Sequence, residues 1–492
     1  MGDENTVLDE AAARHLVRRT GFGAREREIE GVVGRTRGEA ADILLGFRPK
    51  GFRPSGSTIE TARGKWVKNM VKTKVPLQEK LVLFWHDHFA TGYAKVLDVK
   101  RMAIQNKMLR LMCKGDMRVL MKAINKDPAM MDWLDTVRNR KFRENENYAR
   151  ELQELFTLGV YDVNGVANYN QADIVQIARA FSGWDFDDDN NTPFFRDSQH
   201  DYRSEFPGRG SKTIYGPTRG GFPAAQSFAQ PEGETEIDQV TDIIFRHRDS
   251  DGKNTVARRT TKRLLEYFCS GVWATIDATK KAVIDDLILT SNFDVDFNVQ
   301  SLLRAIFTHD AFYASGAAAP FGSSTPRSVK WPIDFVVSTL RMTGVKGKGR
   351  DQVIEGGTFS SLESHLTSMG QVLLDPPSVF GWDWEESWVS SATLLARYTF
   401  ARDLVTVRSG GGRFKPEKLI DLTLTAAPDL VDAVLAALGV TDEFTAFERN
   451  VLITYMGGPS ATLDVLNDTD LRERKIGGLF ALVLQSPVYQ TH

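Results

Sequence analysis

Residues 84–89 have the sequence FWHDHF, in which His86 and His88 flank Asp87. The chain contains 8 histidines in all, so a pair this close together raises the question of a metal site or an acid–base site. Imidazole nitrogens bind transition metals and exchange protons near neutral pH, and both kinds of chemistry are open to such a pair. The alternative is that the two histidines pack in the protein interior and take no part in chemistry.

The residues before this pair predict a helix over 76–90. Pro76 can begin it, and His88 then falls on an apolar face together with Leu81. On an α-helix His86 lies about 160° around the axis from His88, so a straight helix cannot present both rings to one ion. A shared ion requires unwinding near residue 90. Taken alone, His88 is expected to point inward, either bonded to a carboxylate or carbonyl group or acting as ligand or general base.

A second cluster lies in RENENYARELQELFTLG, residues 143–159, which predicts a helix over 145–158. One face of this helix is apolar, and the opposite arc carries Arg150, Glu151 and Glu154 at spacings of three and four residues. Two carboxylates beside an arginine could bind a divalent ion or divide the roles of acid and base. From the spacing alone, an ordinary solvated face with internal ion pairs is the better explanation.

Composition excludes several classes of function. The 62 Lys and Arg nearly balance the 64 Asp and Glu, so no global charge favours nucleic acid or an anionic membrane. The 2 cysteines, Cys113 and Cys269, cannot form a disulfide framework or a thiolate metal site. No apolar signal core and no membrane span are visible, so we expect the chain as written to be cytoplasmic. No P-loop, GxSxG or HExxH motif occurs.

The elements that must position these residues are helices. Apolar residues recur at three- and four-residue intervals, which predicts an all-α protein with one large multi-helical body. Residues 185–233 are rich in turn formers and predict a long irregular insertion with a short hairpin. The stretch 315–326 predicts a boundary between an N-terminal helical body, residues 1–314, and a C-terminal helical part, residues 327–492, unless the two form one continuous domain.

Three tryptophans, Trp382, Trp384 and Trp388, crowd a turn that follows two prolines. Aromatic clusters beside loops can stack on sugars or other rings. More often they hold an extended segment against helices, and we expect that role here.

The runs NENYARELQELFTLGV, DIVQIARAFSGW and FWHDHF resemble the signature of the domain of unknown function 1800 family of bacterial proteins. Further stretches occur in the same order as in that family: AARHLVRRTGFG, DPAMMDWLD, VKWPIDFVVSTLRMTG, MGQVLLDPPSVFGW and LQSPVYQ. The resemblance covers nearly the whole chain. Members of the family often carry export signals and occur beside a sulfatase-like partner family. The resemblance therefore implies such a partner and a periplasmic or secreted location.

The resemblance also implies that particular residues matter. Because the acidic arc belongs to a family signature, a buried polar network or a site becomes a better explanation of it than a solvated face. The residues on matching motif positions are His86, His88, Asn145, Glu146, Asn147, Arg150, Glu151, Glu154, Arg179, Trp184, His200, Asp201, Lys212 and Trp382.

Two hypotheses of function follow. The first is a metal-dependent hydrolytic enzyme that holds zinc, manganese or iron by imidazole and carboxylate groups, because those ions suit such ligands. Its metal ligands are His86, His88 and His200, and its catalytic residues are Arg150, Glu151, Glu154 and Asp201. The second is a non-catalytic binding or assembly protein. In it the same residues form a structural network satisfied by Arg150 and Arg179, and the turn near Trp382 is the contact surface.

Overall fold

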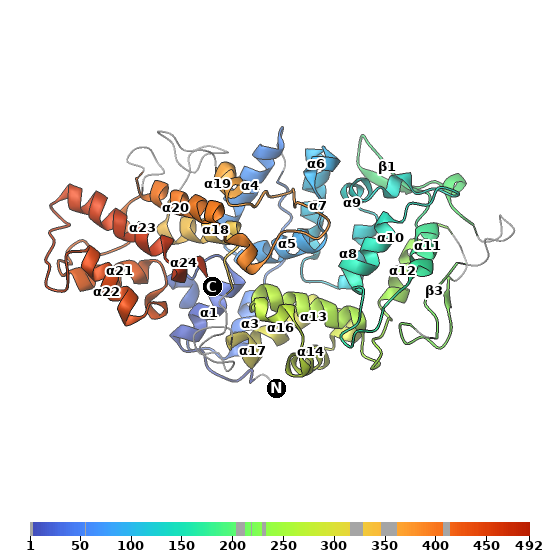
Figure 1. Cartoon of the computed structure of the whole chain (residues 1–492), viewed down its shortest axis with the longest axis horizontal. Coiled ribbons are helices and arrows are strands. Elements are labelled where there is room, and N and C mark those ends of the chain that lie inside the picture. The colour runs from blue at the N-terminus through green and yellow to red at the C-terminus, as the bar shows by residue number, and fades with distance from the viewer. Residues whose placement is uncertain are drawn as a thin grey trace.

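The computed structural model describes residues 3–54, 56–202, 212–217, 219–228, 233–314, 328–345, 362–406 and 414–492. Across these ranges the chain is mainly helical, with two small antiparallel sheets of two strands each (Figure 1). The all-α prediction with a hairpin in the irregular insertion is therefore confirmed. No helix within these ranges is long and apolar enough to cross a bilayer.

The first group of helices lies before residue 134. They are α1 (Glu10–Thr20), α2 (Glu26–Ile29), α3 (Arg37–Leu45), α4 (Ile59–Lys72), α5 (Pro76–His88), α6 (Tyr93–Val96), α7 (Val99–Met112), α8 (Met117–Asn125) and α9 (Pro128–Trp133). Several begin at a capping side chain, as the sequence favours. Asp98 accepts a hydrogen bond from the third residue of α7, and Thr36 forms a capping box with Glu39 at α3.

The second group of helices carries the acidic signature and the segments around it. They are α10 (Asn147–Glu151), η2 (Leu152–Thr157), α11 (Gln171–Ala180), α12 (Glu236–Ile244), α13 (Thr255–Phe268), α14 (Ala278–Ser291), α15 (Phe293–Asp296), α16 (Val299–Thr308) and α17 (Asp310–Tyr313). Strand β1 (Trp184–Asp187) pairs with β2 (Thr192–Phe195), and β3 (Thr213–Ile214) pairs with β4 (Gln226–Ser227).

The C-terminal helices are α18 (Pro332–Thr343), α19 (Leu362–Ser368), α20 (Ser391–Thr406), α21 (Ala427–Ala437), α22 (Ala446–Tyr455), η8 (Leu471–Ile476), α23 (Gly477–Gln485) and α24 (Pro487–Gln490). Short 3₁₀ turns connect elements along the chain: η1 (Thr136–Arg138), η3 (Asp197–Gln199), η4 (Gly271–Ala274), η5 (Glu385–Trp388), η6 (Pro416–Lys418) and η7 (Thr441–Glu443). The predicted boundary at 315–326 lies outside the described residues, so the division into 1–314 and 327–492 stays a prediction.

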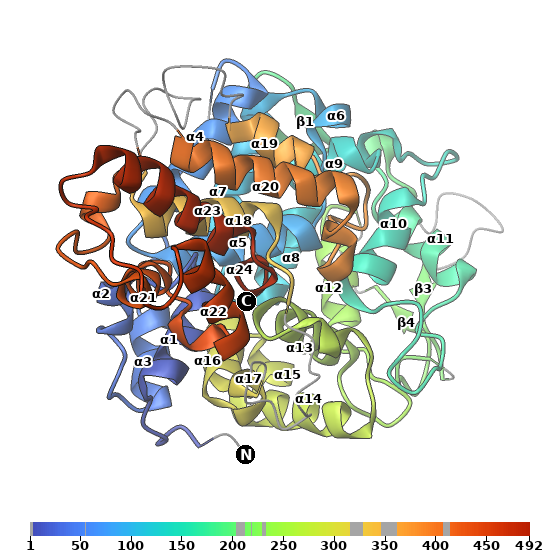
Figure 2. The same cartoon turned by 60° about the vertical axis from the view of Figure 1, so that its left-hand side comes forward.

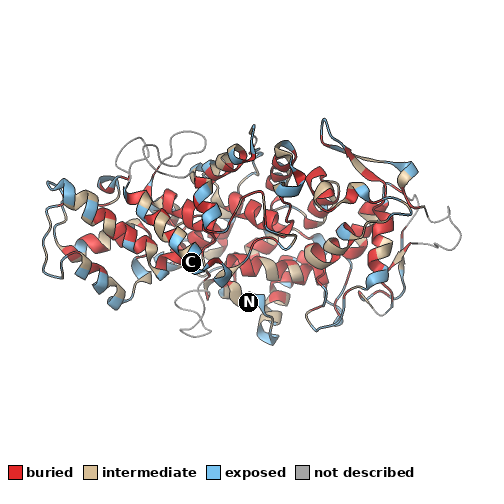
Figure 3. Cartoon of the chain, turned by 45° about the horizontal axis from the view of Figure 1, so that its top comes forward, coloured by how far each residue is buried: buried red, intermediate tan, exposed pale blue. Residues whose placement is uncertain are grey.

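Helix α5 occupies the middle of the molecule, with α4, α7, α13 and α18 around it (Figures 1 and 2). Every residue from Leu77 to His88 is buried. Buried residues run through the middle of the molecule (Figure 3). The sequence predicted one apolar face, whereas the structure covers the helix on all sides. This is possible because its charged side chains have partners on neighbouring elements: Glu79, for example, accepts hydrogen bonds from Trp66 and Arg110.

An ion pair joins α5 to the C-terminal helices. Lys80 Nζ lies 2.9 Å from both carboxylate oxygens of Asp334 on α18, and both side chains are buried. Burial alone would raise the pKa of Asp334, but the charge of Lys80 and a hydrogen bond from His492 hold it below its ordinary value. The N-terminal and C-terminal helices therefore share one interior.

Replacing Lys80 by methionine is expected to lower the free energy of unfolding by about 3–5 kcal/mol, because it leaves the buried carboxylate of Asp334 without its ammonium partner. Urea denaturation measures the change. The matched control is Lys68→Met, at an exposed position of the neighbouring helix α4. Equal stability of the two variants would contradict this role of the ion pair.

Candidate functional site

The ring of His86 packs between two tryptophans and makes no polar contact. Its ring centroid lies 5.8 Å from that of Trp66 and 5.3 Å from that of Trp382, both in edge-to-face geometry. Its Nε2 is buried and has no hydrogen-bond partner in the described chain. Burial lowers the pKa of His86 to about 3, so the ring is neutral at physiological pH.

Asp87, between the two histidines, holds the tryptophan turn in place. Its carboxylate accepts hydrogen bonds from the backbone N–H of Trp382 at 2.8 Å and from the indole of Trp384 at 3.2 Å, and it pairs with Arg263 at 3.2 Å. Gly381 has a φ of +87° and lies so close that a Cβ there would collide with Asp87. Burial raises the pKa of Asp87 to about 6, although Arg263 and both tryptophans oppose that rise.

His88 points inward, as predicted, and bonds a backbone carbonyl. Its Nε2 lies 3.0 Å from the carbonyl oxygen of Phe156, and because a carbonyl only accepts, this nitrogen carries the proton. Burial lowers the pKa of His88 to about 3, and the nearby charges of Arg263 and Arg259 lower it further. The neutral ring therefore donates a hydrogen bond through Nε2, which cannot bind an ion while it carries the proton, and the electron pair of the ring is the one on Nδ1.

The acidic signature helix ends in a wider turn than the predicted α-helix over 145–158. Residues Leu152–Thr157 form a π-helix, with the N–H of Leu158 donating to the carbonyl of Gln153 at 2.8 Å. The carbonyls of Glu154 and Leu155 accept hydrogen bonds from Arg259 on α13. Together with His88 on Phe156, these side chains satisfy carbonyls that an uninterrupted α-helix would use internally. Partners from distant elements therefore determine the form of this turn.

The acidic arc itself lies apart from the histidines. Tyr169 donates a hydrogen bond to Glu154 at 3.0 Å, and Arg150 pairs with Glu146 rather than with either predicted carboxylate. Glu151 is half-buried, and its pKa is raised by burial and by the charge of Glu154. The two carboxylates are thus close enough to influence each other and remain partly accessible.

His200 lies at the centre of a fully buried charged group. Its Nδ1 is 2.7 Å from the carbonyl oxygen of Ser182, so Nδ1 carries the proton, and its Nε2 accepts from Lys212 at 2.9 Å. Lys212 also donates to Glu236 on α12 at 2.7 Å. Burial lowers the pKa of Lys212, and the charge of Glu236 opposes that change. Both ring nitrogens of His200 are therefore used within the chain.

Asp201, the next residue, forms a two-point ion pair with Arg179 on α11. The distances are 2.9 Å from Nε to Oδ2 and 3.2 Å from Nη2 to Oδ1, and the Asp201 side chain is 0% exposed. The sequence expectation that Arg179 satisfies a buried charge agrees with this geometry. His200 and Asp201 together fasten the irregular segment to α11 and α12.

The predicted site residues therefore fall into separate groups. His88 meets the signature helix, as expected, but through a backbone carbonyl, and His86 faces the tryptophan turn on another side of α5. His200 and Asp201 lie beside α11 and α12. Across the part of the chain that the structure describes, no group of three or more His, Cys, Asp or Glu could hold a metal ion.

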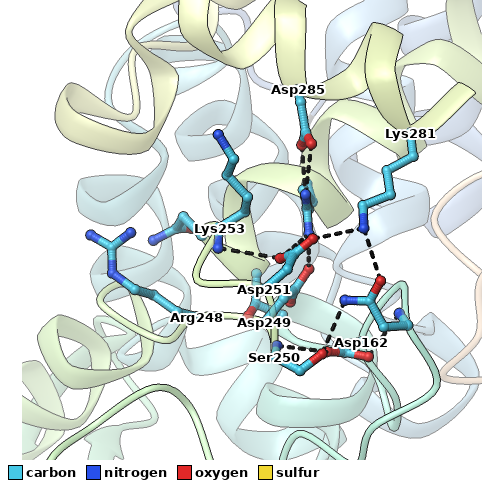
Figure 4. Close-up of polar contacts among 12 residues, drawn as sticks. Asp162, Arg248, Asp249, Ser250, Asp251, Lys253, Lys281 and Asp285 are labelled. Carbon is cyan, nitrogen blue, oxygen red and sulfur yellow. Dashed lines mark hydrogen bonds and ion pairs between the residues drawn. The ribbon is translucent and has the colours of Figure 1, made fainter. Parts of the chain in front are cut away.

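The structure contains a further polar cluster that was not predicted from the sequence. Arg258 on α13, 1% exposed, pairs with Asp249 at 2.8 Å, Asp251 at 2.7 Å and Asp285 at 2.6 Å. Figure 4 shows Asp285 and Lys281 reaching from α14 toward the loop that carries the other two aspartates. The signal in the sequence is DSDG at 249–252, since aspartates at alternate positions before a glycine are typical of loops that surround a cation. In this loop the cation is the guanidinium group of Arg258, which belongs to the same chain.

The His86→Phe variant is expected to resist acid better than the wild type. The unfolded chain protonates this ring near its ordinary pKa of 6.5, whereas the folded ring stays neutral down to about 3. The stability that this difference contributes is present above pH 6.5 and is lost as the pH falls. Between about pH 7 and about pH 4.5 the variant should lose about 3 kcal/mol less than the wild type.

Urea denaturation of both proteins at the two pH values measures this difference, and similar stability near neutral pH is the internal control. An equal loss in both proteins would show that His86 is not held neutral by burial.

Comparison with known proteins gives a family and no function. The chain matches the family model described as a protein of unknown function (DUF1800) over residues 15–491. No curated protein and no solved structure is significantly similar to it. The match spans the FWHDHF helix, the acidic signature helix and the C-terminal helices. The chain therefore belongs to the DUF1800 family of proteins of unknown function.

Proposed function

We propose that the chain is a non-catalytic binding or assembly protein whose signature residues form a structural polar network. The observation that carries this proposal is the engagement of the signature side chains with one another and with the backbone. His88 bonds the Phe156 carbonyl, His200 bonds Ser182 and Lys212, and Asp201 pairs with Arg179. A general base or metal ligand needs a free electron pair within reach of its target. His200 accepts from Lys212 through the one ring nitrogen that carries no proton, and the carboxylate of Asp201 accepts two hydrogen bonds from Arg179.

The energetics of buried charges agree with a role in specifying the fold. A buried ion pair gives little net stability compared with apolar residues of the same size, yet removing one partner is costly. Any fold that separates the two charged partners of such a pair is therefore much less stable. In this chain such pairs join the irregular segment to α11 and α12. Other pairs join α5 to α7, α13 and α18. Both groups support a scaffold that presents surfaces to a partner.

A sulfatase-like protein, which the family resemblance implies, is our candidate partner. Since family members often carry export signals, such a complex would form in the periplasm or outside the cell. The side chain of Trp382 is 3% exposed, so the aromatic contact of this turn would come from Phe380, which is 67% exposed.

A metal-dependent hydrolytic enzyme is the second candidate, and one observation favours it. Glu151 and Glu154 are partly accessible, neighbouring carboxylates, and the raised pKa of Glu151 favours the role of an acid for that residue. In this alternative zinc, manganese or iron would be held beside them, and Arg150 would orient the substrate.

The Asp201→Asn variant is expected to lower the free energy of unfolding by about 3–5 kcal/mol, because Arg179 keeps a buried charge without its carboxylate. If the role of Asp201 is structural, the substitution should lower the free energy of unfolding by the same amount in the presence of chelator and in the presence of added zinc. Urea denaturation under both conditions measures it, with Asp189→Asn on the exposed hairpin tip as control. The metal enzyme would be supported instead if chelator lowered the stability of the wild type and left the stability of the Asp201→Asn variant unchanged.

A further inference from the structure

A pocket of about 530 Å³ lies between the N-terminal helices α1 and α2 and the C-terminal elements α21 and η7. Figure 2 shows α21 beside α1 and α2. None of the signature residues lines this pocket. Its volume falls within the range of about 300–1,000 Å³ that is usual for ligand sites.

The walls of the pocket are acidic. Asp9, Glu10 and Glu26 come from the N-terminal side and Asp442 from the C-terminal side. The side chains of Glu10 and Asp442 are 64% and 62% exposed, so they are accessible to a ligand. These four carboxylates face one arginine, and the pocket is therefore negative although the whole chain has a formal charge of only -2.

The arginine that lines the pocket has an unused donor. The side chain of Arg14 is 8% exposed, and its terminal nitrogen pairs with Glu10. Its Nε is buried and has no hydrogen-bond partner in the described residues. Asp442 Oδ2 lies 3.9 Å from this Nε, beyond hydrogen-bond distance. A ligand that fits the pocket would bring an acceptor to this N–H as well as a cation to the carboxylates.

Exposed apolar side chains lie on the helix that comes next in the sequence after the pocket residue Asp442. Helix α22 begins shortly after Asp442, and its residues Phe447 and Val451, one turn apart, are 78% and 53% exposed. A polypeptide supplies all three features at once: a cationic side chain, backbone carbonyls and apolar neighbours. A free ion or a small amine supplies only the first.

We infer that this pocket binds an arginine side chain of a partner polypeptide. Its guanidinium lies between the carboxylates of Glu26 and Asp442, because a planar fork of donors matches carboxylate geometry better than an ammonium group does. A carbonyl of the same segment accepts from Arg14 Nε. The inference rests on the proposed binding function and names the class of partner.

Isothermal titration calorimetry with the full chain tests this. The probes are the peptide acetyl-Leu-Arg-Leu-amide, its citrulline analogue, which has nearly the same shape without the charge, and free L-arginine. The arginine peptide should bind at least about tenfold more tightly than either of the other two, and its affinity should fall as salt is added. The double variant Glu26→Gln/Asp442→Asn should lose at least about tenfold in affinity, and the exposed control Glu417→Gln should lose none.

Three results would overturn the inference: no binding of the arginine peptide, equal affinity for the citrulline peptide, or equal affinity for free L-arginine. Neither carboxylate forms a hydrogen bond in the part of the chain that the structure describes, so we expect the double variant to fold. Circular dichroism checks that unfolding is not the cause of a loss of affinity. Failure here would leave the Asp201→Asn test unaffected, so the two proposals fail separately.

Discussion

The complete burial of α5 is the constraint on which the rest of the structure depends. A helix covered on all sides is normally apolar all round, yet this one carries Glu79, Lys80, His86, Asp87 and His88 in its interior positions. Each charged side chain removed from water needs a partner of opposite charge or a set of hydrogen bonds. The neighbours of α5 are therefore determined by what its polar residues require.

Those partners come from widely separated parts of the chain. Glu79 is met by α4 and α7, Lys80 by Asp334 on α18, and Asp87 by Arg263 on α13 and by the tryptophan turn. His88 reaches the π-helix of the acidic signature. The FWHDHF helix and the acidic signature helix are thus in contact, because His88 of the first donates a hydrogen bond to the last turn of the second. This contact gives His88 a partner in the interior and involves no side chain of the acidic helix.

Local patterns in the sequence predicted much of this arrangement. The helix expected over 76–90 is α5, the inward direction of His88 is confirmed, and the hairpin of the irregular insertion is present as β1 and β2. Pro76 and the spacing of apolar residues are local signals, and local signals suffice for such features.

Features that depend on distant partners could not be predicted from those patterns. Glu79 and Lys80 look like a solvated face until Arg110 and Asp334 are placed beside them. The π-turn exists because Arg259 and His88 take up its carbonyls, and no spacing within residues 143–159 indicates that. The pairing of Lys212 with Glu236 joins residues on two separate elements in the same way.

Native-state hydrogen exchange, followed by mass spectrometry, tests the central claim most directly. Peptides that cover 76–88, 147–159 and 200–202 would be compared after removal of metal by chelator and again after addition of zinc. If the polar residues of these segments have structural roles, the segments should be strongly protected, and the exchange rates should be the same under both conditions. Faster exchange of 147–159 and 200–202 in chelator, restored by zinc, would contradict the structural account and point to a metal site.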